Sequence, residues 1–339
     1  MDYRTLGRTG VSVSPLCLGT MMFGPWGNAD EQDSIRVIHH ALDAGVNFVD
    51  TADVYSGGES ERITGKALQG RRDDVVLATK FFMPMSDEPN HRGGSRKWIM
   101  RSVEDSLQRL QTDYIDLYQV HRPSPDTDVE ETLGALSDLV RQGKVRYIGS
   151  SSYAASQIVE AQWTARERNL QRFVTEQPPY SILVRGIEAD VLPTAQRHGM
   201  GILTYSPLGG GWLSGRWRKD SASSPTSSAR PAARFDMTSP ANQQKLDVVE
   251  ELALLAEENG ITLIQLALAF VIRHPAVTSA IIGPRTMDQL TSQLAAADVV
   301  LTDAVLDRID ELVAPGVTIN PDDNSYGATE LTPAARRRA

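Results

Sequence analysis

The sequence has little cysteine and no long apolar segment, and these absences exclude several classes of protein. Its one cysteine, Cys17, rules out an intramolecular disulfide framework. Cys17 stands in the apolar run 15–18, which is typical of a small buried side chain. No apolar run approaches the length of a membrane span, and residues 1–4 lack the apolar core of a secretory signal. We therefore expect a cytoplasmic protein without a membrane partner.

Basic residues are also in the minority. The chain has 34 Lys and Arg against 43 Asp and Glu, a formal net charge of -9. An acidic surface repels nucleic acid and anionic membranes, so neither is an expected partner. A phosphorylated cofactor would need a local basic patch. The 41% of hydrophobic residues is enough for a large core.

Short apolar runs alternate with segments of helical period. One helical face, for example, holds Ile35, Ile38, Ala41 and Leu42, and Gly45 then ends the helix as a left-handed cap. Alternating strands and helices predict a parallel sheet with right-handed crossovers. Eight units favour a closed (β/α)8 TIM barrel over a doubly wound sheet. We read the eight strands at 16–19, 47–50, 75–80, 115–121, 145–150, 173–177, 201–205 and 278–282.

Three segments depart from this repeat. Residues 3–13 predict an N-terminal β-hairpin, and residues 206–240 a long Gly/Ser/Pro-rich loop after the seventh barrel strand. Residues 314–339 are irregular and end in Arg336, Arg337 and Arg338, which a solvated tail explains. Long loops in compact domains are functional or disordered. No low-complexity linker divides the chain, so we expect one domain over 1–339, with a core at about 6–312 and a C-terminal loop and tail at about 314–339.

Four polar residues stand where apolar strands end. Asp50 closes the second strand, Tyr55 follows in the next loop, Lys80 closes the third strand and His121 the fourth. All strand C-termini of a parallel barrel open on one rim, so these side chains should converge. Three of them also have a purely structural interpretation: Asp50 as a helix or turn cap, Tyr55 as a loop tyrosine and His121 as a core histidine. Lys80 lacks an obvious structural use, and the joint placement favours an active site.

This combination suits carbonyl reduction. Hydride addition builds negative charge on the carbonyl oxygen, which needs a proton donor. A free tyrosine has a pKa of about 10, and a nearby Lys80 ammonium lowers the pKa of Tyr55. Asp50 would hold Lys80 charged and oriented. A neutral His121 would donate to the carbonyl oxygen and orient the substrate.

The same residues resemble a known family. The segment from Phe48 to Tyr55, followed by Gly58-Glu59-Ser60-Glu61, resembles the first signature of the aldo-keto reductases. Asp50, Tyr55, Lys80 and His121 match the catalytic tetrad of that family, and the likeness runs from about Leu6 to about Leu312. The chain is most similar to the bacterial, potassium-channel-β-like branch. The resemblance implies an NADPH-dependent oxidoreductase that reduces aldehydes or ketones with Tyr55 as the proton donor.

A cofactor site is predicted on the loops after strands seven and eight. The chain has no Gly-x-Gly-x-x-Gly after its first strand, so a Rossmann site is not indicated, whereas a barrel can bind phosphates at these two loops. The run 204–211 contains Tyr205, an aromatic face for nicotinamide, and glycines that let backbone N–H groups approach phosphate. Gly283 precedes a helix, and Arg285 suits a phosphate monoester. A rim tyrosine and a solvated arginine are the structural alternatives for Tyr205 and Arg285.

The resemblance extends this site residue by residue. It implies that Gly19, Thr20 and Met21 lie beside the nicotinamide ribose, that Ser151 and Gln177 hold the carboxamide, and that Arg216 lies near the pyrophosphate. Arg285 would bind the 2′-phosphate and favour NADPH over NADH. Two departures are Ser152, where the family commonly has Asn, and Ser292-Gln293, where a Glu-Asn pair is common. The full predicted cofactor set is Gly19, Thr20, Met21, Asp50, Ser151, Ser152, Gln177, Tyr205, Ser206, Leu208, Gly210, Arg216, Gly283, Arg285, Gln289 and Gln293.

The predicted substrate is a small carbonyl compound. The expected pocket combines Tyr55 and His121 with apolar walls from Met22, Trp26 and Phe81, and Phe82 is a further candidate. Trp26 and Phe82 fit ordinary packing equally well. By resemblance, residues 317–326 cover the mouth of the pocket.

Two other functions compete with catalysis. An NADP-binding redox sensor or regulatory subunit with slow chemistry would use the same scaffold. A metal-dependent hydrolase would need several His and carboxylate ligands on the rim, and the six histidines are too dispersed to supply them. We expect no metal. The residues define no oligomeric state.

Overall fold

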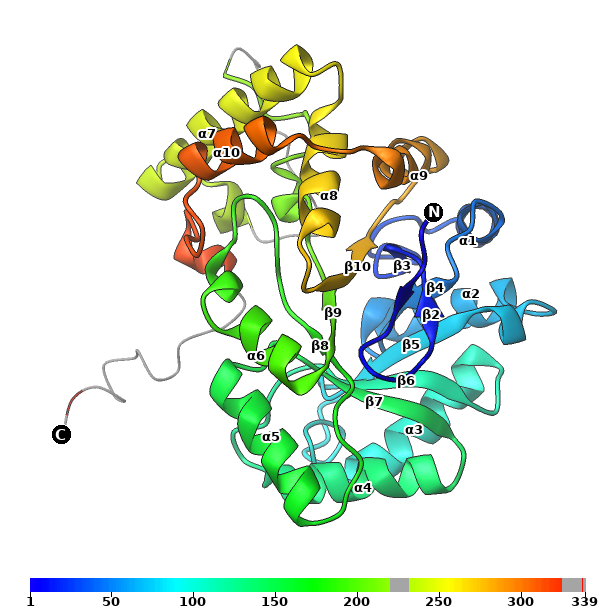
Figure 1. Cartoon of the computed structure of the whole chain (residues 1–339). Coiled ribbons are helices and arrows are strands. Elements are labelled where there is room, and N and C mark those ends of the chain that lie inside the picture. The colour runs from blue at the N-terminus through cyan, green and yellow to red at the C-terminus, as the bar shows by residue number, and fades with distance from the viewer. Residues whose placement is uncertain (220–231, 325–336, 338–339) are drawn as a thin grey trace.

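Eight parallel strands form a closed barrel (Figure 1). The computed structural model describes residues 1–219, 232–324 and 337. The strand order is β10-β3-β4-β5-β6-β7-β8-β9, and β3 pairs with both β10 and β4, which closes the ring. This confirms the (β/α)8 prediction. The strands are β3 (Leu16–Gly19), β4 (Phe48–Asp50), β5 (Val76–Phe81), β6 (Ile115–Val120), β7 (Val145–Ser151), β8 (Thr175–Gln177), β9 (Gly201–Thr204) and β10 (Val277–Ile282).

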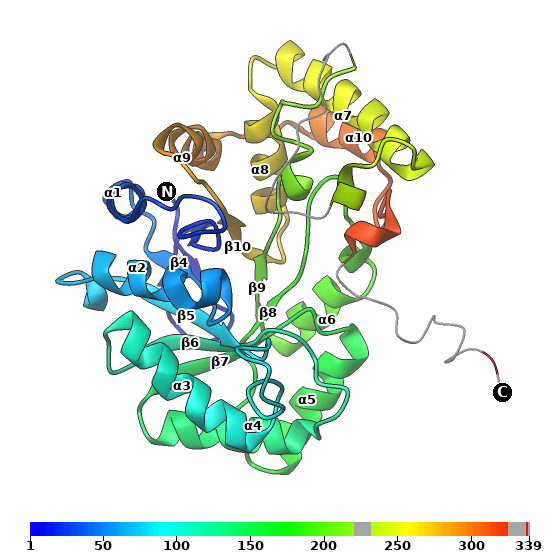
Figure 2. The same ribbon diagram turned by 180° about the vertical axis from the view of Figure 1, so that it is seen from behind.

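Helices surround the barrel on its outer side, as the two opposite views show (Figures 1 and 2). Their ends follow local chemistry. Asp30 caps α1 by accepting a 2.9 Å hydrogen bond from the Asp33 amide, and Gly45 follows with the predicted left-handed φ of +93°. The helices are α1 (Glu31–Asp43), α2 (Glu59–Ala67), α3 (Arg96–Leu110), α4 (Val129–Arg141), α5 (Ala155–Glu167), α6 (Val191–His198), α7 (Pro240–Glu258), α8 (Leu263–Arg273), α9 (Met287–Leu294) and α10 (Asp303–Leu312).

The predicted N-terminal hairpin is present and plugs one end of the barrel. Its strands β1 (Arg4–Thr5) and β2 (Ser12–Val13) pair antiparallel. Leu6 and Val13 are fully buried in the barrel interior. A Cβ on Gly7 would lie 2.8 Å from the Val174 carbonyl and 2.9 Å from the Gly201 amide, both at the start of barrel strands. The hairpin therefore seals the N-terminal end and leaves the opposite rim for the site.

Two apolar layers make up the core. The barrel interior contains Cys17, Phe48 and Ala78, and a larger layer lies between the strands and the helices. Side chains along β5 alternate between the two layers. Lys80 is two positions after Ala78, so both side chains point into the barrel. Phe81 lies in the outer layer against Tyr118, with ring centroids 4.9 Å apart. The placement of Phe81 in the substrate pocket was therefore wrong, because a single residue step along the strand reverses the direction of its side chain.

The long segments contribute short helices. The segment after β9 includes η4 (Gly209–Gly211) and η5 (Ala232–Phe235), and the C-terminal segment includes η7 (Pro321–Asp323). The Ile319 amide donates to the Leu183 carbonyl at 3.2 Å, which ties the C-terminal segment to the loop after β8. Arg336, Arg338 and the last two positions of the stretch 317–326 lie outside the described residues.

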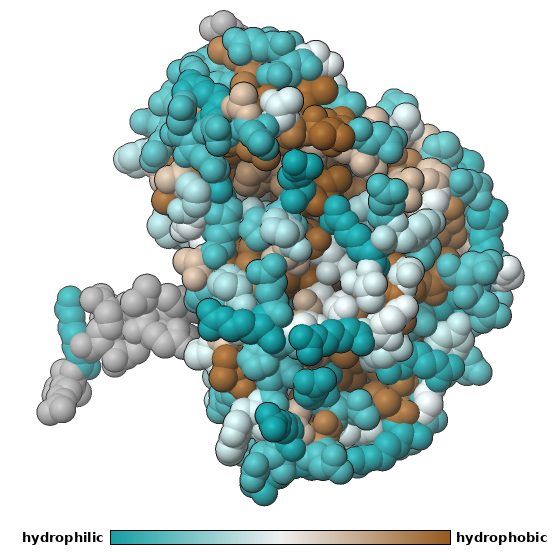
Figure 3. Space-filling view, viewed as in Figure 1, coloured by the Kyte–Doolittle hydropathy of each residue, from teal (hydrophilic) through white to brown (hydrophobic). Residues whose placement is uncertain are grey.

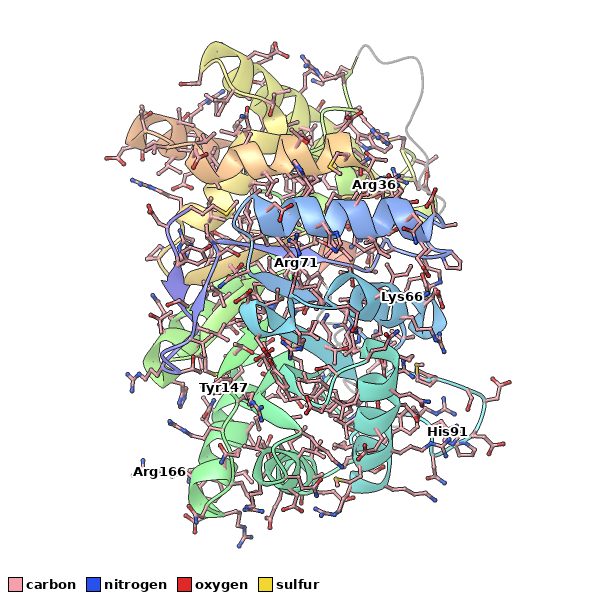
Figure 4. The ribbon with its side chains drawn as sticks, turned by 90° about the vertical axis from the view of Figure 1, so that its right-hand side faces the viewer. Arg36, Lys66, Arg71, His91, Tyr147 and Arg166 are labelled. Carbon is pink, nitrogen blue, oxygen red and sulfur yellow. The ribbon has the colours of Figure 1, made fainter. Side chains whose placement is uncertain are left out.

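The outer surface is rich in charge. Figure 4 labels Arg36, Lys66 and Arg71 on the helix-covered side, where each pairs with a carboxylate: Asp33, Glu31 and Asp43, respectively. The face in Figure 3 is mostly hydrophilic, with smaller apolar areas. Across the described ranges, no single helix is long and apolar enough to cross a membrane; α7 and α8 pass that test only together, as a pair bent by 94°.

Candidate active site

The structure brings together the side chains of Asp50, Tyr55 and Lys80 at the open rim. The Lys80 ammonium donates to Asp50 Oδ1 at 2.5 Å, to the Thr51 carbonyl at 2.8 Å and to the Tyr55 hydroxyl at 3.2 Å. Lys80 is fully buried behind Tyr55. One buried cation thus links a carboxylate to a phenol, which is the arrangement predicted from the strand ends.

His121 completes the group. It follows β6 directly, and its backbone amide donates to the Phe81 carbonyl at 3.0 Å, which continues the pairing of β6 with β5. Its ring lies edge-on to that of Tyr55, with centroids 5.9 Å apart and planes at 83°. The side chain is only 8% exposed, and among the described residues its Nδ1 has no hydrogen-bond partner.

A run of left-handed residues shapes the loop that presents Tyr55. Ser56, Gly57 and Gly58 have φ values of +51°, +65° and +92°. Gly58 also packs tightly, since a Cβ there would lie 2.7 Å from Arg109 Cδ. Glycine is the residue that tolerates both conditions. The chain therefore turns sharply after Tyr55 and enters α2.

Asp50 is held by two buried amides. Gln119 and Gln177 donate to its Oδ2 at 3.1 and 2.9 Å, and the Gln177 side chain also donates to Gln119 Oε1 at 3.2 Å. Because Oδ2 is occupied in this way, Oδ1 faces Lys80. Gln119 was missed in the sequence analysis, since a glutamine within an apolar strand gives no signal of its partner.

Burial and charge set the protonation states. Burial lowers the pKa of Lys80, but Asp50 and Tyr55 outweigh it, so the net shift is upward and the ammonium stays charged. Burial raises the pKa of Tyr55, and Lys80 opposes this shift without cancelling it. The expectation of a lowered Tyr55 pKa was thus wrong in net direction. Burial, with Lys80 and Arg122, holds the pKa of His121 well below its usual value, so the imidazole is neutral.

A second buried ion pair supports the site from behind. Glu61 of α2 accepts from Arg109 Nε and from Thr79 Oγ1, each at 2.6 Å. Ser60 donates to the Thr20 carbonyl at 2.7 Å. These contacts fix α2 against β3 and β5, the strands next to β4. The only sequence signal for them was the run Gly58-Glu59-Ser60-Glu61.

A cavity of about 540 Å³ extends from the tetrad across the rim. Asp50, Tyr55 and His121 lie in its wall. Most predicted cofactor residues share the same wall, although they come from distant parts of the chain. The predicted residues that line it are Gly19, Met21, Met22, Ser151, Gln177, Tyr205, Ser206, Leu208, Gly210, Arg216, Gly283, Arg285, Gln289 and Gln293.

Several predicted residues lie outside the wall of the cavity. The Thr20 side chain is buried and bonds Ser60 at 2.8 Å, while Ser152 bonds the Tyr205 hydroxyl at 3.2 Å. Trp26 is 44% exposed, with its ring centroid 6.3 Å from that of Tyr55. Phe82 packs against the outer core layer.

The long segments contribute wall residues that periodicity did not reveal. The rings of Trp217 and Phe235 are stacked, with their centroids 5.3 Å apart, and both residues line the cavity. Asp323, in the C-terminal segment, also lines the cavity. Its carboxylate forms an ion pair with Arg234 at 3.0 Å and a second one with Lys245 at 2.6 Å. Such contacts between irregular segments leave no repeating pattern in a sequence.

The wall distant from the tetrad suits a phosphorylated ligand. Gly209, Gly210 and Gly211 have φ values of +58°, +74° and +109° and all three line the cavity, so a ligand can approach the backbone closely there. Arg216 and Arg285 lie in the same wall. Gln293 adds a buried carbonyl oxygen, Oε1, without a partner among residues 1–219, 232–324 and 337. In that same part of the chain, no group of three or more His, Cys, Asp or Glu could hold a metal ion.

A closed parallel barrel with this Asp–Tyr–Lys–His group beside a rim cavity defines a barrel oxidoreductase. The aldo/keto reductase family model matches residues 15–314, and the chain belongs to this family.

Its relatives include an uncharacterized oxidoreductase of Bacillus subtilis, YrpG, which is 42% identical over 92% of this chain and 96% of its own length. A probable voltage-gated potassium channel subunit beta of Arabidopsis thaliana is 36% identical over 92% of this chain and 97% of its own length. The aldo-keto reductase YhdN of Bacillus subtilis is 36% identical over 86% of this chain and 87% of its own length.

Proposed function

We propose that this protein is an NADPH-dependent oxidoreductase that reduces small aldehydes or ketones to alcohols, with Tyr55 as the proton donor. The observation that supports this most directly is the 3.2 Å contact between the Lys80 ammonium and the Tyr55 hydroxyl at the cavity wall. It supplies an acid next to a charge that stabilises the phenolate left after proton transfer.

Each tetrad residue has one task in this proposal. Tyr55 gives its proton to the carbonyl oxygen as negative charge develops there. Lys80 stabilises the resulting phenolate, and Asp50 keeps Lys80 in place. His121, neutral because of burial, donates a hydrogen bond to the same carbonyl oxygen. The reduced nicotinamide supplies the hydride when it is bound.

The cavity wall favours NADPH. Arg216 would bind the pyrophosphate, and the lack of side chains at Gly209, Gly210 and Gly211 in the same wall would let it lie close to the backbone. Arg285 would pair with the 2′-phosphate, which NADH lacks. The unpartnered Gln293 Oε1 would accept a hydrogen bond from the adenine amine.

The direct test compares NADPH and NADH oxidation across a panel of aldehydes and ketones, with Tyr55→Phe beside the wild type. Removing the phenol should lower kcat by about 10²-fold or more, while NADPH still quenches the protein fluorescence. Tyr114→Phe is the matched control, because the Tyr114 hydroxyl bonds Asp73 on the surface. Equal turnover by Tyr55→Phe and wild type would remove Tyr55 from the chemistry.

A second function is favoured by one comparison: the relative from Arabidopsis is named a probable channel subunit beta. The alternative is an NADP-binding redox sensor or regulatory subunit with slow catalysis. Fast transfer in a single turnover, followed by much slower steady-state turnover and retention of cofactor through gel filtration, would support it. Steady-state turnover as fast as the single turnover would contradict it.

A further inference from the structure

We infer that Arg122 recognises a carboxylate on the substrate, so that the preferred carbonyl compounds are oxo acids or formyl acids. This inference rests on the proposed function and names its substrate class. Arg122 follows His121 in the chain, is half-buried and lines the same cavity as His121 and Tyr55. A cation therefore stands at the catalytic end of the cavity, where it lowers the pKa of His121 and opposes the rise in the pKa of Tyr55, but it donates no hydrogen bond to either side chain.

The cofactor does not account for Arg122. Arg216 and Arg285 follow β9 and β10, where the phosphates are expected. Arg122 follows β6 and bonds Ser152, which follows β7. In the closed ring β6 lies four strands from β10, on the opposite side of the barrel. Arg122 thus faces the substrate end rather than the phosphate end.

No carboxylate of the described residues lies within ion-pair distance of Arg122; the buried Glu176 interacts with its charge, but burial raises the pKa of Glu176 to about 8, so that carboxyl is largely protonated at neutral pH. Its Nη1 donates to the His121 carbonyl at 2.8 Å and to Ser152 Oγ at 3.0 Å, and both acceptors are neutral. None of the ion pairs formed by the described residues includes Arg122, whereas Arg234 of the same wall is paired with Asp323. A half-buried guanidinium without an anion is unfavourable unless a ligand supplies one.

The hydrogen bonds also orient the guanidinium. Both use Nη1, while Nε and Nη2 form no hydrogen bond with the described residues. The Nε–Nη2 edge is the planar fork that binds a carboxylate with two parallel hydrogen bonds. Ser152, which itself bonds Tyr205 at 3.2 Å, holds the other edge. The free edge is thus arranged for a carboxylate.

The carboxylate takes no part in the reaction. The carbonyl carbon accepts the hydride from the reduced nicotinamide, the carbonyl oxygen accepts the proton of Tyr55, and the products are a hydroxy acid and the oxidised cofactor. Arg122 acts in positioning, because an anchored carboxylate places the carbonyl against Tyr55 and His121. Discrimination should therefore appear in kcat/KM and largely in KM.

The test uses 4-carboxybenzaldehyde and its neutral methyl ester, methyl 4-formylbenzoate, with NADPH at pH 7. Wild-type protein should favour the acid by about tenfold or more in kcat/KM, as a charge-assisted pair implies. Arg122→Gln should lower kcat/KM for the acid at least tenfold more than for the ester, and Arg122→Lys should give an intermediate ratio. The matched control is Arg166→Gln, an exposed residue of α5 that is labelled in Figure 4 and does not line the cavity, and it should keep the wild-type ratio.

Several outcomes would overturn the inference. Equal kcat/KM values of the wild-type protein for the acid and the ester would do so. Equal losses of kcat/KM for both substrates in Arg122→Gln would also do so, because Arg122 would then act through the cofactor or Tyr55. Reduction of neither compound would count against the proposed function instead. Benzoate binding to the NADP⁺-saturated protein then still tests Arg122: weakening by tenfold or more in Arg122→Gln supports the inference, and equal binding refutes it. Thermal unfolding of each variant, with Arg122→Lys as the conservative change, identifies losses caused by misfolding.

Discussion

Gln177 donates a 2.9 Å hydrogen bond to Asp50, although 127 positions separate the two residues in the chain. Gln119 donates to the same oxygen from the intervening strand β6. The carboxylate that orients Lys80 is therefore itself oriented from across the barrel. Gln177 also lines the cavity, so it contacts both the proposed catalytic group and the expected cofactor space.

Gln119→Leu should separate the support of Asp50 from cofactor binding, because Gln119 donates to Asp50 but does not line the cavity. We expect kcat to fall about tenfold, the cost of one charge-assisted hydrogen bond, with little change in the affinity for NADPH. Steady-state kinetics and a fluorescence titration measure the two effects. Gln162→Leu is the control, since its buried amide bonds the Phe173 carbonyl in the outer layer and should affect stability alone. A wild-type kcat for Gln119→Leu would show that Asp50 needs only one amide.

Lys80→Met should change both the rate and the pH profile. Burial raises the pKa of Tyr55 above its ordinary value, and Lys80 opposes that shift. Reduction needs the protonated phenol, so its rate should be flat through neutral pH and fall only in alkaline solution, whereas alcohol oxidation should rise with pH. Without the ammonium the Tyr55 pKa rises further, so the oxidation profile should move to higher pH, with kcat lower by about 10²- to 10⁴-fold. An oxidation profile at unchanged pH would exclude Lys80 as the group that tunes Tyr55.

Arg285→Ala should alter the choice between cofactors. Losing a charged pair with the 2′-phosphate should raise the Kd for NADPH by about 10- to 100-fold and leave NADH binding nearly unchanged. Arg216→Ala provides the comparison, because the pyrophosphate is common to both cofactors and their affinities should fall together. Parallel losses of NADPH and NADH in Arg285→Ala would place that guanidinium elsewhere on the ligand.

Asp323→Ala should speed cofactor release. Asp323 joins Arg234 to the buried Lys245 and lines the cavity, so it ties the C-terminal segment to the segment after β9. Without this carboxylate Lys245 is buried without an anion, and the C-terminal segment is no longer held to the segment after β9. We expect NADPH to dissociate several-fold faster in stopped-flow displacement. Asp322→Ala, at the exposed neighbouring position, should dissociate like wild type, and identical rates for both variants would dismiss the tie.

Glu176→Gln should stabilise the protein at alkaline pH. Burial raises the pKa of Glu176 to about 8, against about 4.3 in an unfolded chain. Between these values the folded state binds more protons than the unfolded state, so the free energy of unfolding falls as pH rises. A glutamine keeps the contacts with Ser150 and the Tyr153 amide without the charge. Urea unfolding should show a gain of about 4 kcal/mol at pH 8 and less than about 1 kcal/mol at pH 4.5; a gain equal at both values would contradict ionisation as the cause.

The barrel and the tetrad were predictable because both follow from strand periodicity. Each barrel strand was found from its apolar run, and Asp50, Lys80 and His121 stand where those runs end. Phe81 was misplaced because its residue type fits either face of β5. Gln119, Arg109 and Asp323 were missed because their partners lie on other elements, and a single sequence does not record which buried polar groups meet. The net pKa of Tyr55 required the degree of burial, which only the fold supplies.

The Arg4 guanidinium, at the start of the hairpin, donates to the carbonyls of Ile272 and Val277, which lie 268 and 273 positions further along the chain. These two hydrogen bonds of the hairpin can therefore form only after the start of the last barrel strand, β10, has been synthesised. During synthesis on the ribosome the hairpin can meet Gly45 and Asn47 early, but its Arg4 contacts must wait until residues 272–277 have emerged, so closing the bottom of the barrel belongs among the later events of folding.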